Sequence, residues 1–451
     1  MDKSHEWDTL AKIVYRRTYA RKQPNGTLET WPDTVDRVIR GNTRLVKVDA
    51  EEQAQLREIM LTRKGIPAGR GLWQSGTETQ QKLGGVSQNN CFFWTSENQN
   101  HFVYAQDYLM LGGGVGLSSE HQFVSKLPKV LPNVKISHQN DFAADFIVPD
   151  TREGWNLLLR LVLKSYLQTG KGFTYSTKAV RAAGEPIGGF GGTSSGPGPL
   201  IKLIDQLCAL LNSRAKKHLR PIDAADIICM IGQMVVAGNV RRSAIIILGD
   251  CWDKEFLSAK QWQSGNIPNY RAFANYSVVC SDVDDLHPAF WKTFEYGEPF
   301  GIINRKAIQK FGRMGEKLND TAIGVNPCAE IPLENGEPCC LVEIPLMNLT
   351  SEDEFIHVAR LLYRYAKRVT LETYHNEITD AIVKKNHRIG VGITGCLASP
   401  LFNESTLARV YAILRAEDKK YSEELGVPQS IRLTTIKPSG TVSKLLSQNG
   451  Y

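Results

Sequence analysis

Short apolar runs that alternate with longer amphipathic stretches constrain the fold of this chain more than any other feature of its sequence. Residues 244–248 (AIIIL) form a short run rich in β-branched side chains, as expected for a buried strand. Similar runs occur at residues 389–393 and 431–436. Between the first two of these runs, residues 352–374 carry apolar side chains at the spacing of an amphipathic helix. Strands that alternate with helices in this way predict an α/β fold.

The same patterns place further elements along the chain. Apolar residues recur at helical spacing in four more segments, residues 48–61, 152–168, 200–212 and 224–236. Residues 91–94 form another β-like run, and residues 1–70 as a whole are charged and helical in character. We expect the glycine-rich residues 109–116 (LMLGGGVG) to form a loop after a helix. Residues 188–198 (GGFGGTSSGPG) are too rich in glycine and serine for either helix or strand.

Length and composition limit the classes of protein that this chain can be. Its 451 residues exceed what one ordinary core serves, which predicts one large barrel or two to three domains. No segment offers the roughly 20 continuous apolar residues of a membrane helix. Residues 1–30 lack the apolar core of a signal peptide, so we expect a cytoplasmic protein.

The net charge of +7 is mild for this length and suits a small anionic ligand as well as nucleic acid. No basic run is interleaved with aromatic residues, so we expect no direct nucleic-acid site. The nine cysteines are odd in number and irregularly spaced. No pair of CxxC motifs occurs among them, so we expect no metal site of the structural zinc kind. In a cytoplasmic chain most cysteines are reduced and act as small buried apolar residues.

The most informative stretch for chemistry is residues 326–331 (NPCAEI). In an extended segment, residues two apart project in the same direction, so Asn326, Cys328 and Glu330 would face one small substrate together. Cys339 follows eleven residues after Cys328, and Cys340 comes directly after it. For a lone Cys-x-Glu, however, a loop with a buried cysteine and a solvated glutamate is the more common interpretation.

The wider context favours chemistry, because residues 326–331 resemble the radical-cysteine loop of the ribonucleotide reductases. Seven further motifs resemble that family in the family's own order: residues 89–91 (NNC), 112–116 (GGGVG), 192–197 (GTSSGP), 238–244 (GNVRRSA), 339–341 (CCL), 388–392 (RIGVG) and 437–441 (KPSGT). The resemblance covers residues from about 70 to 445 and identifies the chain as a catalytic subunit. The family has asparagine where this chain has Cys340, which we expect to be a bystander.

The resemblance implies a role for each of five residues. Cys328 becomes a thiyl radical and takes the hydrogen atom from C3′ of the ribose. Glu330 accepts the proton of the 3′-hydroxyl, and Asn326 orients the sugar hydroxyls. Cys91 and Cys339 supply two electrons and become a disulfide while the 2′-hydroxyl leaves as water. That pairing requires their Cα atoms to lie within roughly 7 Å of each other.

The resemblance also implies a set of nucleotide contacts. The substrate-binding residues are Thr77, Asn90, Gly112, Pro438, Ser439, Gly440 and Thr441. The last four would form a phosphate loop, and a helix that starts near Val442 would add a favourable dipole. The loop that relays the identity of a nucleotide effector contains Gly238, Asn239, Arg241 and Arg242. Taken alone, residues 438–441 read more simply as a capped turn, and the two arginines as a solvated surface pair.

The fold implied by the resemblance is a ten-stranded α/β barrel at residues 71–451, preceded by a short helical region at residues 1–70. That region is too short for the family's ATP-cone domain, so we expect no overall activity switch by ATP and dATP. The chain ends ten residues after Thr441, before the family's final strand and C-terminal redox tail. We therefore expect a fragment, one half of a split gene, or an unusually short member.

The wording of the motifs most resembles the adenosylcobalamin-dependent class, in which the cofactor generates the radical. The alternative is an iron- or manganese-dependent class, whose radical comes from a separate subunit with two metal ions. Gly450-Tyr451 resembles the motif of the glycyl-radical class, but the arginine expected upstream is absent. The implied partners are a ribonucleoside di- or triphosphate, a nucleotide effector and a thioredoxin-like or dithiol reductant.

Three further alternatives remain open. A homodimer could form through helices near residues 100–110 and 152–168. A formate-lyase relative would share the barrel and use adjacent cysteines, for which Cys339-Cys340 would be the signal. A barrel that binds nucleotides without activity is the third, although the three essential cysteines and Glu330 are all present.

Overall fold

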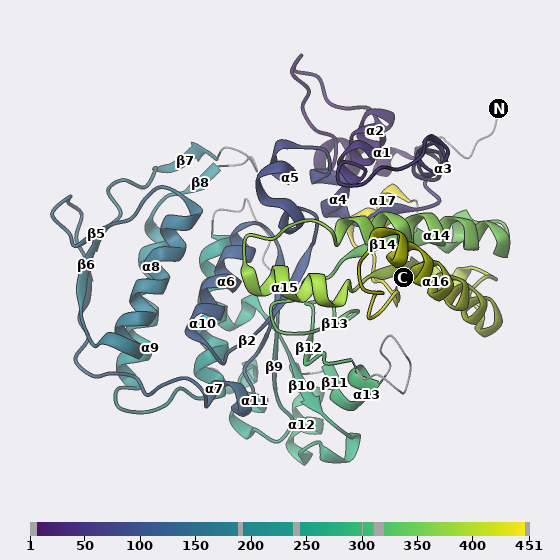
Figure 1. Ribbon diagram of the computed structural model, residues 1–451. Helices are drawn as coiled ribbons and strands as arrows, with labels where there is room; N and C mark the ends of the chain where they lie inside the picture. Colours follow the sequence, from purple (N-terminus) through teal and green to yellow (C-terminus); the bar gives the residue numbers. More distant parts are fainter. Residues whose placement is uncertain (1–6, 188–192, 238–243, 300, 311–319, 447–451) are drawn as a thin grey trace.

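Two sheets of mainly parallel strands lie side by side at the centre of the molecule (Figure 1). The computed structural model describes residues 7–187, 193–237, 244–299, 301–310 and 320–446. Sheet one has the order β11-β10-β9-β3-β2 and all its neighbours are parallel. Its strands are β2 Cys91–Thr95, β3 Gly114–Ser118, β9 Ile245–Asp250, β10 Asn275–Cys280 and β11 Gly301–Asn304.

Sheet two has the order β1-β14-β15-β16. Its strands are β1 Ile66–Pro67, β14 Leu341–Pro345, β15 Gly390–Thr394 and β16 Thr434–Ile436. The last three are parallel to one another, whereas β1 runs antiparallel to β14. The helical N-terminal region thus contributes a short strand of its own to this sheet.

A short antiparallel joint connects the two sheets. Phe92 of β2 is bridged to Pro338, Phe93 N–H donates to the Glu337 carbonyl (3.1 Å), and Cys339 N–H donates to the Cys91 carbonyl (2.9 Å). The sheets therefore run in opposite directions. Within the described residues, β11 ends one sheet and β16 ends the other, and no ladder joins these two edges. The predicted α/β class is confirmed, but the predicted ten-stranded barrel is not: the described strands form two open sheets.

A small hairpin lies against sheet one and carries the residues of greatest chemical interest. It consists of β12 Gly324–Val325 and β13 Pro332–Leu333, paired antiparallel. The hairpin approaches so closely that a Cβ atom on Gly116 would lie 2.2 Å from the Val325 carbonyl oxygen. A Cβ atom on Gly324 would lie 2.1 Å from the ring of Phe93. Glycine at these two positions is what lets the hairpin sit against the sheet.

Helices cover the outer face of sheet two. Val342 and Ile344 of β14, with Val391 and Ile393 of β15, belong to an apolar core that they share with these helices. The helices are α2 Trp31–Asn42, α3 Ala50–Leu61, α14 Glu352–Val369, α16 Glu404–Leu425 and α17 Thr441–Leu445. Because side chains alternate along a strand, the residues between these four point to the inner face, toward the hairpin.

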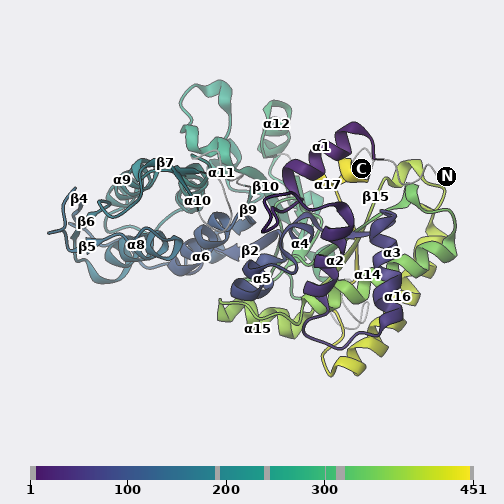
Figure 2. The same ribbon diagram turned by 90° about the horizontal axis from the view of Figure 1, so that it is seen from above.

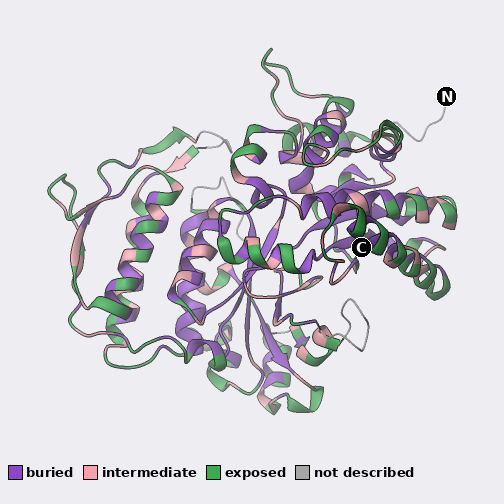
Figure 3. Ribbon diagram, viewed as in Figure 1, coloured by how far each residue is buried: buried purple, intermediate pink, exposed green. Residues whose placement is uncertain are grey.

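A second, larger core lies on the outer side of sheet one, where α6 Gln99–Met110 and α10 Pro221–Val236 cover the strands. Beyond them α8 Arg152–Lys164 and α9 Gly198–Ser213 form a lobe that extends away from the sheets (Figures 1 and 2). The short strands of this lobe are β4 Ile136–His138, β5 Phe146–Ile147, β6 Phe173–Ser176, β7 Ala183–Pro186 and β8 Thr193–Ser195. In Figure 3 the strands β2, β3 and β9 of sheet one are almost entirely buried, whereas α8 shows both buried and exposed residues.

Polar contacts between α6 and α8 add to the apolar core that the lobe shares with the rest of the molecule. Arg152 forms an ion pair with Asp107, and Gln106 Nε2 donates to Asn156 Oδ1 (3.0 Å). The side-chain amide of Asn156 also donates to Asp107 (2.5 Å). These are the two helices considered above as the interface of a homodimer. In the structure they pack against each other within one chain.

The remaining helices are short. They are α1 Thr9–Thr18, α4 Gly69–Gln74, α5 Glu78–Leu83, α7 His121–Val124, α11 Lys254–Ser258, α12 Pro288–Tyr296, α13 Arg305–Lys310 and α15 Glu377–Asn386. Within the described residues, no helix combines the length and apolar character needed to span a membrane.

Two segments that were predicted to be loops contain parts of helices or strands. The glycine-rich residues 109–116 do not form one loop, because β3 already begins at Gly114, where glycine accommodates the hairpin. In the second glycine-rich segment, Thr193–Ser195 forms β8 against β7, and α9 begins at Gly198. Residues 188–192 of that segment lie outside the described residues. The helix predicted at 352–374 ends at Val369.

Replacing Gly116 by alanine tests the close approach of the hairpin. The added methyl group would overlap the Val325 carbonyl, and overpacking of this kind costs about 1–3 kcal/mol of unfolding free energy. We expect a lower midpoint of urea-induced unfolding, measured by tryptophan fluorescence. Gly198→Ala is the matched control, because nothing lies within 4 Å of its Cβ position. Equal midpoints for the two variants would contradict this account of the hairpin.

Candidate active site

The loop between β12 and β13, residues 326–331 and here called the cysteine loop, is a tight turn. Ala329 N–H donates to the Asn326 carbonyl (2.8 Å), and Asn326 N–H donates to the Ile331 carbonyl (3.2 Å). Ala329 adopts a left-handed backbone conformation with φ of 60°. The prediction of an extended segment is therefore wrong, because the paired strands on either side close the loop upon itself.

The turn nevertheless brings the amide and the carboxylate together. Asn326 is fully buried, and its Nδ2 donates to Glu330 Oε2 (2.8 Å) while its Oδ1 accepts from Ile331 N–H (3.1 Å). The hydroxyl of Thr435 on β16 donates to the Glu330 carbonyl (2.7 Å). The Glu330 side chain is thus oriented by its own loop, and the loop is tied to sheet two.

Cys328 stands at the exposed tip of this loop. All nine cysteines lie in the described part of the chain, and Cys328 is the exposed one among them. Partial desolvation of its sulfur by the surrounding protein, followed by the charge of Glu330 and the proximity of Cys91, raises the pKa of Cys328 to about 12. At neutral pH this residue is therefore a thiol and carries a hydrogen atom on sulfur.

Cys91 and Cys339 face each other beside the loop. They are opposite residues of the antiparallel joint, and such pairs have Cα atoms about 5.5 Å apart, within the range of a disulfide. Both are free thiols, and they are hydrogen-bonded to each other. That hydrogen bond and burial raise the pKa of Cys339 well above its usual range. The pair is therefore reduced and close enough to form a disulfide.

Cys340 lies on the other side of its strand. Its sulfur donates to the Ala366 carbonyl on α14 (3.4 Å), and burial raises its pKa to about 12. The structure thus separates Cys340 from the facing pair, although the two residues are adjacent in sequence.

A buried ion network anchors the segment that carries Cys339. Asp320 pairs with Arg388 (2.5 Å) and with Arg432 (2.7 Å), and Arg388 also lies 3.0 Å from Glu337. Burial raises the pKa of Glu337. Arg388 belongs to a motif noted in the sequence, but Asp320 and Glu337 carried no signal, because Arg388 lies 68 and 51 positions away from them along the chain.

Lys437 belongs to the motif at residues 437–441, but the sequence analysis gave it no role in the chemistry. Its ammonium group pairs with the buried Glu343 (2.9 Å) and acts electrostatically on Glu330 and Cys328. Burial acts to lower its pKa, but these three groups outweigh burial and raise the pKa of Lys437. A permanent positive charge therefore lies near the cysteine loop.

The predicted phosphate loop follows directly after Lys437. Ser439 is buried, and its Oγ has no hydrogen-bond partner among the described residues. Gly440 is the N-cap of α17, which starts at Thr441, one residue before the predicted position. Pro438, Gly440 and Thr441 are exposed. The loop thus offers one unsatisfied buried hydroxyl and a group of accessible backbone atoms.

The other predicted substrate-binding residues do not all lie near the cysteines. The Asn90 carbonyl accepts from Gly114 N–H (2.7 Å), so Asn90 lies next to Cys91 where β2 and β3 begin. Gly112, with φ of 78°, precedes β3 at the same end. Thr77 is committed to local structure: its hydroxyl donates to the Gln74 carbonyl (2.7 Å) and caps α5. Among the described contacts, none joins Thr77 to the cysteines.

The predicted effector loop cannot be placed. Gly238, Asn239, Arg241 and Arg242 all lie outside the described residues.

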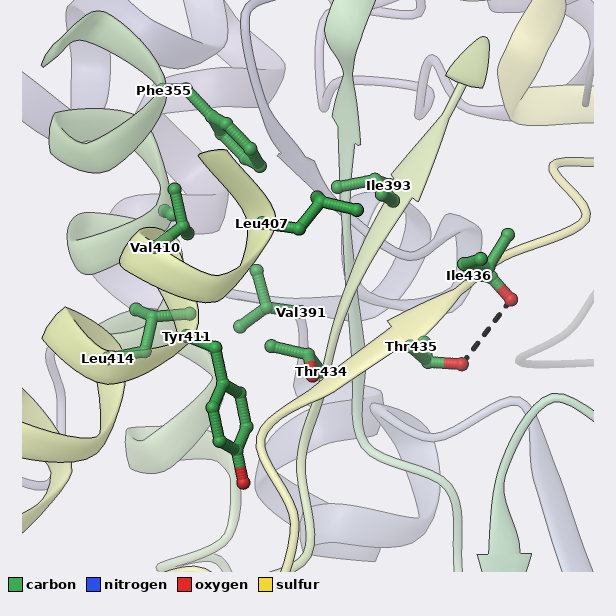
Figure 4. Close-up of a pocket in the computed structure, with 11 residues that line it drawn as sticks. Phe355, Val391, Ile393, Leu407, Val410, Tyr411, Leu414, Thr434, Thr435 and Ile436 are labelled. Atoms are coloured by element: carbon green, nitrogen blue, oxygen red, sulfur yellow. Dashed lines mark hydrogen bonds between the residues drawn. The ribbon is translucent and has the colours of Figure 1, made fainter. Parts of the chain in front are cut away.

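An apolar cavity of about 200 Å³ lies on the opposite, outer face of sheet two (Figure 4). Leu407, Val410 and Leu414 of α16 face Val391 of β15 across it. Thr435 also borders the cavity but directs its hydroxyl to the cysteine loop. Because its lining is almost entirely apolar, this cavity offers little to a phosphorylated substrate.

Comparisons with known proteins agree with one another. The family model for the ribonucleotide reductase alpha domain matches residues 1–77, and that for the insertion domain of B12-dependent ribonucleotide reductase matches residues 130–211. An adenosylcobalamin-dependent ribonucleoside-triphosphate reductase from Lactobacillus leichmannii is 34% identical over 97% of this chain and 72% of the relative. The corresponding protein of Lacticaseibacillus paracasei is 33% identical with the same coverage.

The structural comparison gives the same answer. A crystal structure described as a B12-dependent (class II) ribonucleotide reductase superposes with a TM-score of 0.89 at 31% identity. The match covers 98% of this chain and 74% of that chain. The lobe built from α8, α9 and their short strands corresponds to the insertion domain, which the sequence did not reveal.

The facing arrangement of Cys91 and Cys339 predicts one specific disulfide. Mild oxidation should join these two residues, because their backbones are already at disulfide distance. Peptide mapping by mass spectrometry should find this link in the unmodified chain and in Cys340→Ser, but not in Cys339→Ser. A bond from Cys340 to either of the other two cysteines would show that the strand is oriented differently.

The raised pKa of Cys328 predicts the pH dependence of its alkylation. Only the thiolate reacts, so a pKa of about 12 should make the rate with iodoacetamide rise about tenfold for each pH unit between about pH 8 and 10. The rate is measured on the peptide that contains Cys328. A plateau near pH 9, as for an ordinary cysteine, would refute the raised pKa.

Proposed function

The chain belongs to the adenosylcobalamin-dependent ribonucleotide reductases, and we propose that it reduces ribonucleoside triphosphates through a thiyl radical on Cys328. One observation carries this assignment of residues. The cysteine loop carries an exposed thiol, Cys328, and a carboxylate, Glu330, that an amide holds in place. The facing pair of reduced cysteines, Cys91 and Cys339, lies beside this loop. The relatives are named triphosphate reductases, which favours a triphosphate over a diphosphate as the substrate.

The first half of the reaction removes a hydrogen atom from the sugar. Cys328 as a thiyl radical takes the hydrogen from C3′ and becomes a thiol. Glu330 then accepts the proton of the 3′-hydroxyl, a task suited to a carboxylate that is fixed in place. Asn326 holds that carboxylate, and its buried position restricts both side chains to one geometry.

The second half reduces the sugar. Cys91 and Cys339 give up two electrons and two protons and form a disulfide, while the 2′-hydroxyl leaves as water. Cys328 returns its hydrogen atom to C3′ and is again a radical, and Glu330 returns its proton to the 3′-oxygen. The sum is ribonucleotide plus dithiol giving deoxyribonucleotide, disulfide and water. A dithiol or thioredoxin-like reductant must then reduce the disulfide before the next turnover.

The radical source that fits is adenosylcobalamin, as in the relatives, rather than a separate subunit with two metal ions. When bound, this cofactor supplies the unpaired electron that converts the Cys328 thiol into a radical. The chain meets one requirement for this directly, because Cys328 is the accessible cysteine and retains its hydrogen atom at neutral pH.

For substrate binding we propose that Ser439, Gly440 and Thr441 receive phosphate oxygens. The unsatisfied hydroxyl of buried Ser439 supports this role, because a buried hydroxyl without a partner costs free energy until a ligand satisfies it. Asn90 and Gly112, which lie together near Cys91, are proposed to border the nucleotide. Control by a nucleotide effector through residues 238–242 also belongs to the proposal.

Deoxynucleotide formation from a ribonucleoside triphosphate tests the proposed function. With dithiothreitol under anaerobic conditions, product should form only when adenosylcobalamin is added. Cys328→Ser should reduce the rate to background, because serine cannot form an equivalent radical. Cys340→Ser is the matched control and should keep the activity, since Cys340 faces α14. Absence of product from the unmodified chain with cofactor would contradict the proposal.

A further inference from the structure

A second pair of neighbouring cysteines lies at the carboxyl ends of the strands of sheet one. Asp250 of β9 is the register partner of Val279 of β10. Cys251 follows Asp250 directly, and Cys280 follows Val279 as the last residue of β10. Neighbouring strands lie about 4.8 Å apart, and disulfides join residues whose Cα atoms are about 4.4–6.8 Å apart. The register of the two strands therefore brings these cysteines within reach of each other.

Both side chains point to the outer face of sheet one. Tyr276 of β10 and its register partner Ile247 of β9 belong to the core on that face. Cys280 and Cys251 lie four residues further along the same two segments, and both belong to that core as well. Val279, which precedes Cys280, belongs instead to the cluster on the other face, with the hairpin. Because side chains alternate along a strand, the two thiols lie side by side in one buried environment.

The turn that follows β10 fixes the position of Cys251. The Cys251 S–H donates to the Asp285 carbonyl (3.3 Å), and His287 N–H donates to the Cys251 carbonyl (3.2 Å). Because this turn begins directly after Cys280, its contacts hold the end of β9 beside the end of β10. Burial, followed by the proximity of Cys280 and Asp285, raises the pKa of Cys251 to about 11. Cys251 is therefore a protonated thiol at neutral pH.

This second pair lies far from the facing cysteines Cys91 and Cys339. Val115 of β3, one residue after the register partner of Cys91, is itself paired with Ile245 at the start of β9. Cys251 comes six residues after Ile245. At a rise of about 3.3 Å per residue, the two pairs are on the order of 20 Å apart along the sheet. Thiols of one pair therefore cannot react directly with thiols of the other in the folded chain.

We propose that Cys251 and Cys280 are a second redox-active pair, which oxidation converts into a disulfide that braces the carboxyl ends of β9 and β10. With hydrogen peroxide as the oxidant, one thiol becomes a sulfenic acid and one water molecule is released. The other thiol attacks that sulfur, the S–O bond breaks, the S–S bond forms, and a second water molecule leaves. The two thiols thus lose two electrons and two protons, and a dithiol reductant reverses the change. This inference does not depend on the proposed function.

Peptide mapping of the folded, unmodified chain tests the pairing. The chain is treated with hydrogen peroxide at alkaline pH, where more of each thiol is in the reactive thiolate form. Mass spectrometry should find a peptide pair joined through Cys251 and Cys280, separate from any link between Cys91 and Cys339, and dithiothreitol should release it. Recovery of Cys251 and Cys280 as free thiols or as sulfonic acids, or a link from either of them to another cysteine, would overturn the proposal.

Thermal unfolding tests whether the disulfide braces the sheet. The variant Cys339→Ser removes the other pair, so that any stabilisation on oxidation comes from elsewhere. Oxidation of this variant should raise the midpoint of unfolding by a few degrees, because a bond between residues 251 and 280 restricts the unfolded chain. The midpoint is followed by circular dichroism, and dithiothreitol should restore the original value.

Two double variants complete the test of the brace. Cys339→Ser with Cys396→Ala is the matched control and should keep the shift on oxidation, since Cys396 is as well buried as Cys280. Cys339→Ser with Cys280→Ala should lose it. A shift that persists without Cys280, or no shift in any of the three variants, would overturn the proposal. Peptide mapping of the unmodified chain still decides the pairing if Cys280→Ala fails to fold.

Discussion

The antiparallel joint between β2 and the segment before β14 is the constraint on which the rest of the structure depends. Parallel strands alone would keep the two sheets apart, and their facing ends would not meet. The joint turns sheet two against sheet one and places Cys91 opposite Cys339 with a backbone hydrogen bond between them. It thereby fixes the two facing cysteines through main-chain geometry, which does not depend on the conformation of either side chain.

Charged and polar groups further restrain the segments that the joint brings together. The Asp320–Arg388–Glu337 network holds the strand of Cys339 from one side, and Thr435 holds the cysteine loop from the other. Each anchor joins segments distant in sequence, and the close approach of Val325 to Gly116 adds a contact between the hairpin and sheet one. The proposed radical site would benefit from such rigidity, because a reactive group accelerates a reaction only when it is correctly placed.

Local pattern predicted much of this molecule. The β-branched run at residues 244–248 and the apolar periodicity of residues 352–374 identified β9 and α14, because burial on a sheet or helix leaves a direct trace in sequence. The extended conformation expected for Asn326 to Glu330 was wrong, because the closure of that loop is decided by pairing between β12 and β13. The contact between Lys437 and Glu343 was not predicted, because β15 lies between the strands that carry them and the strand order is not visible in the sequence. The roles given to the cysteines remain predictions.

The contact between α6 and α8 has a consequence for how the molecule behaves in dilution. The face of α6 that meets α8 is covered by a lobe that belongs to the same chain. Formation of the contact between α6 and α8 is intramolecular and therefore first-order. Its effective concentration is determined by the segments that connect the two helices. The Asp107–Arg152 pair and its neighbours therefore persist at any protein concentration.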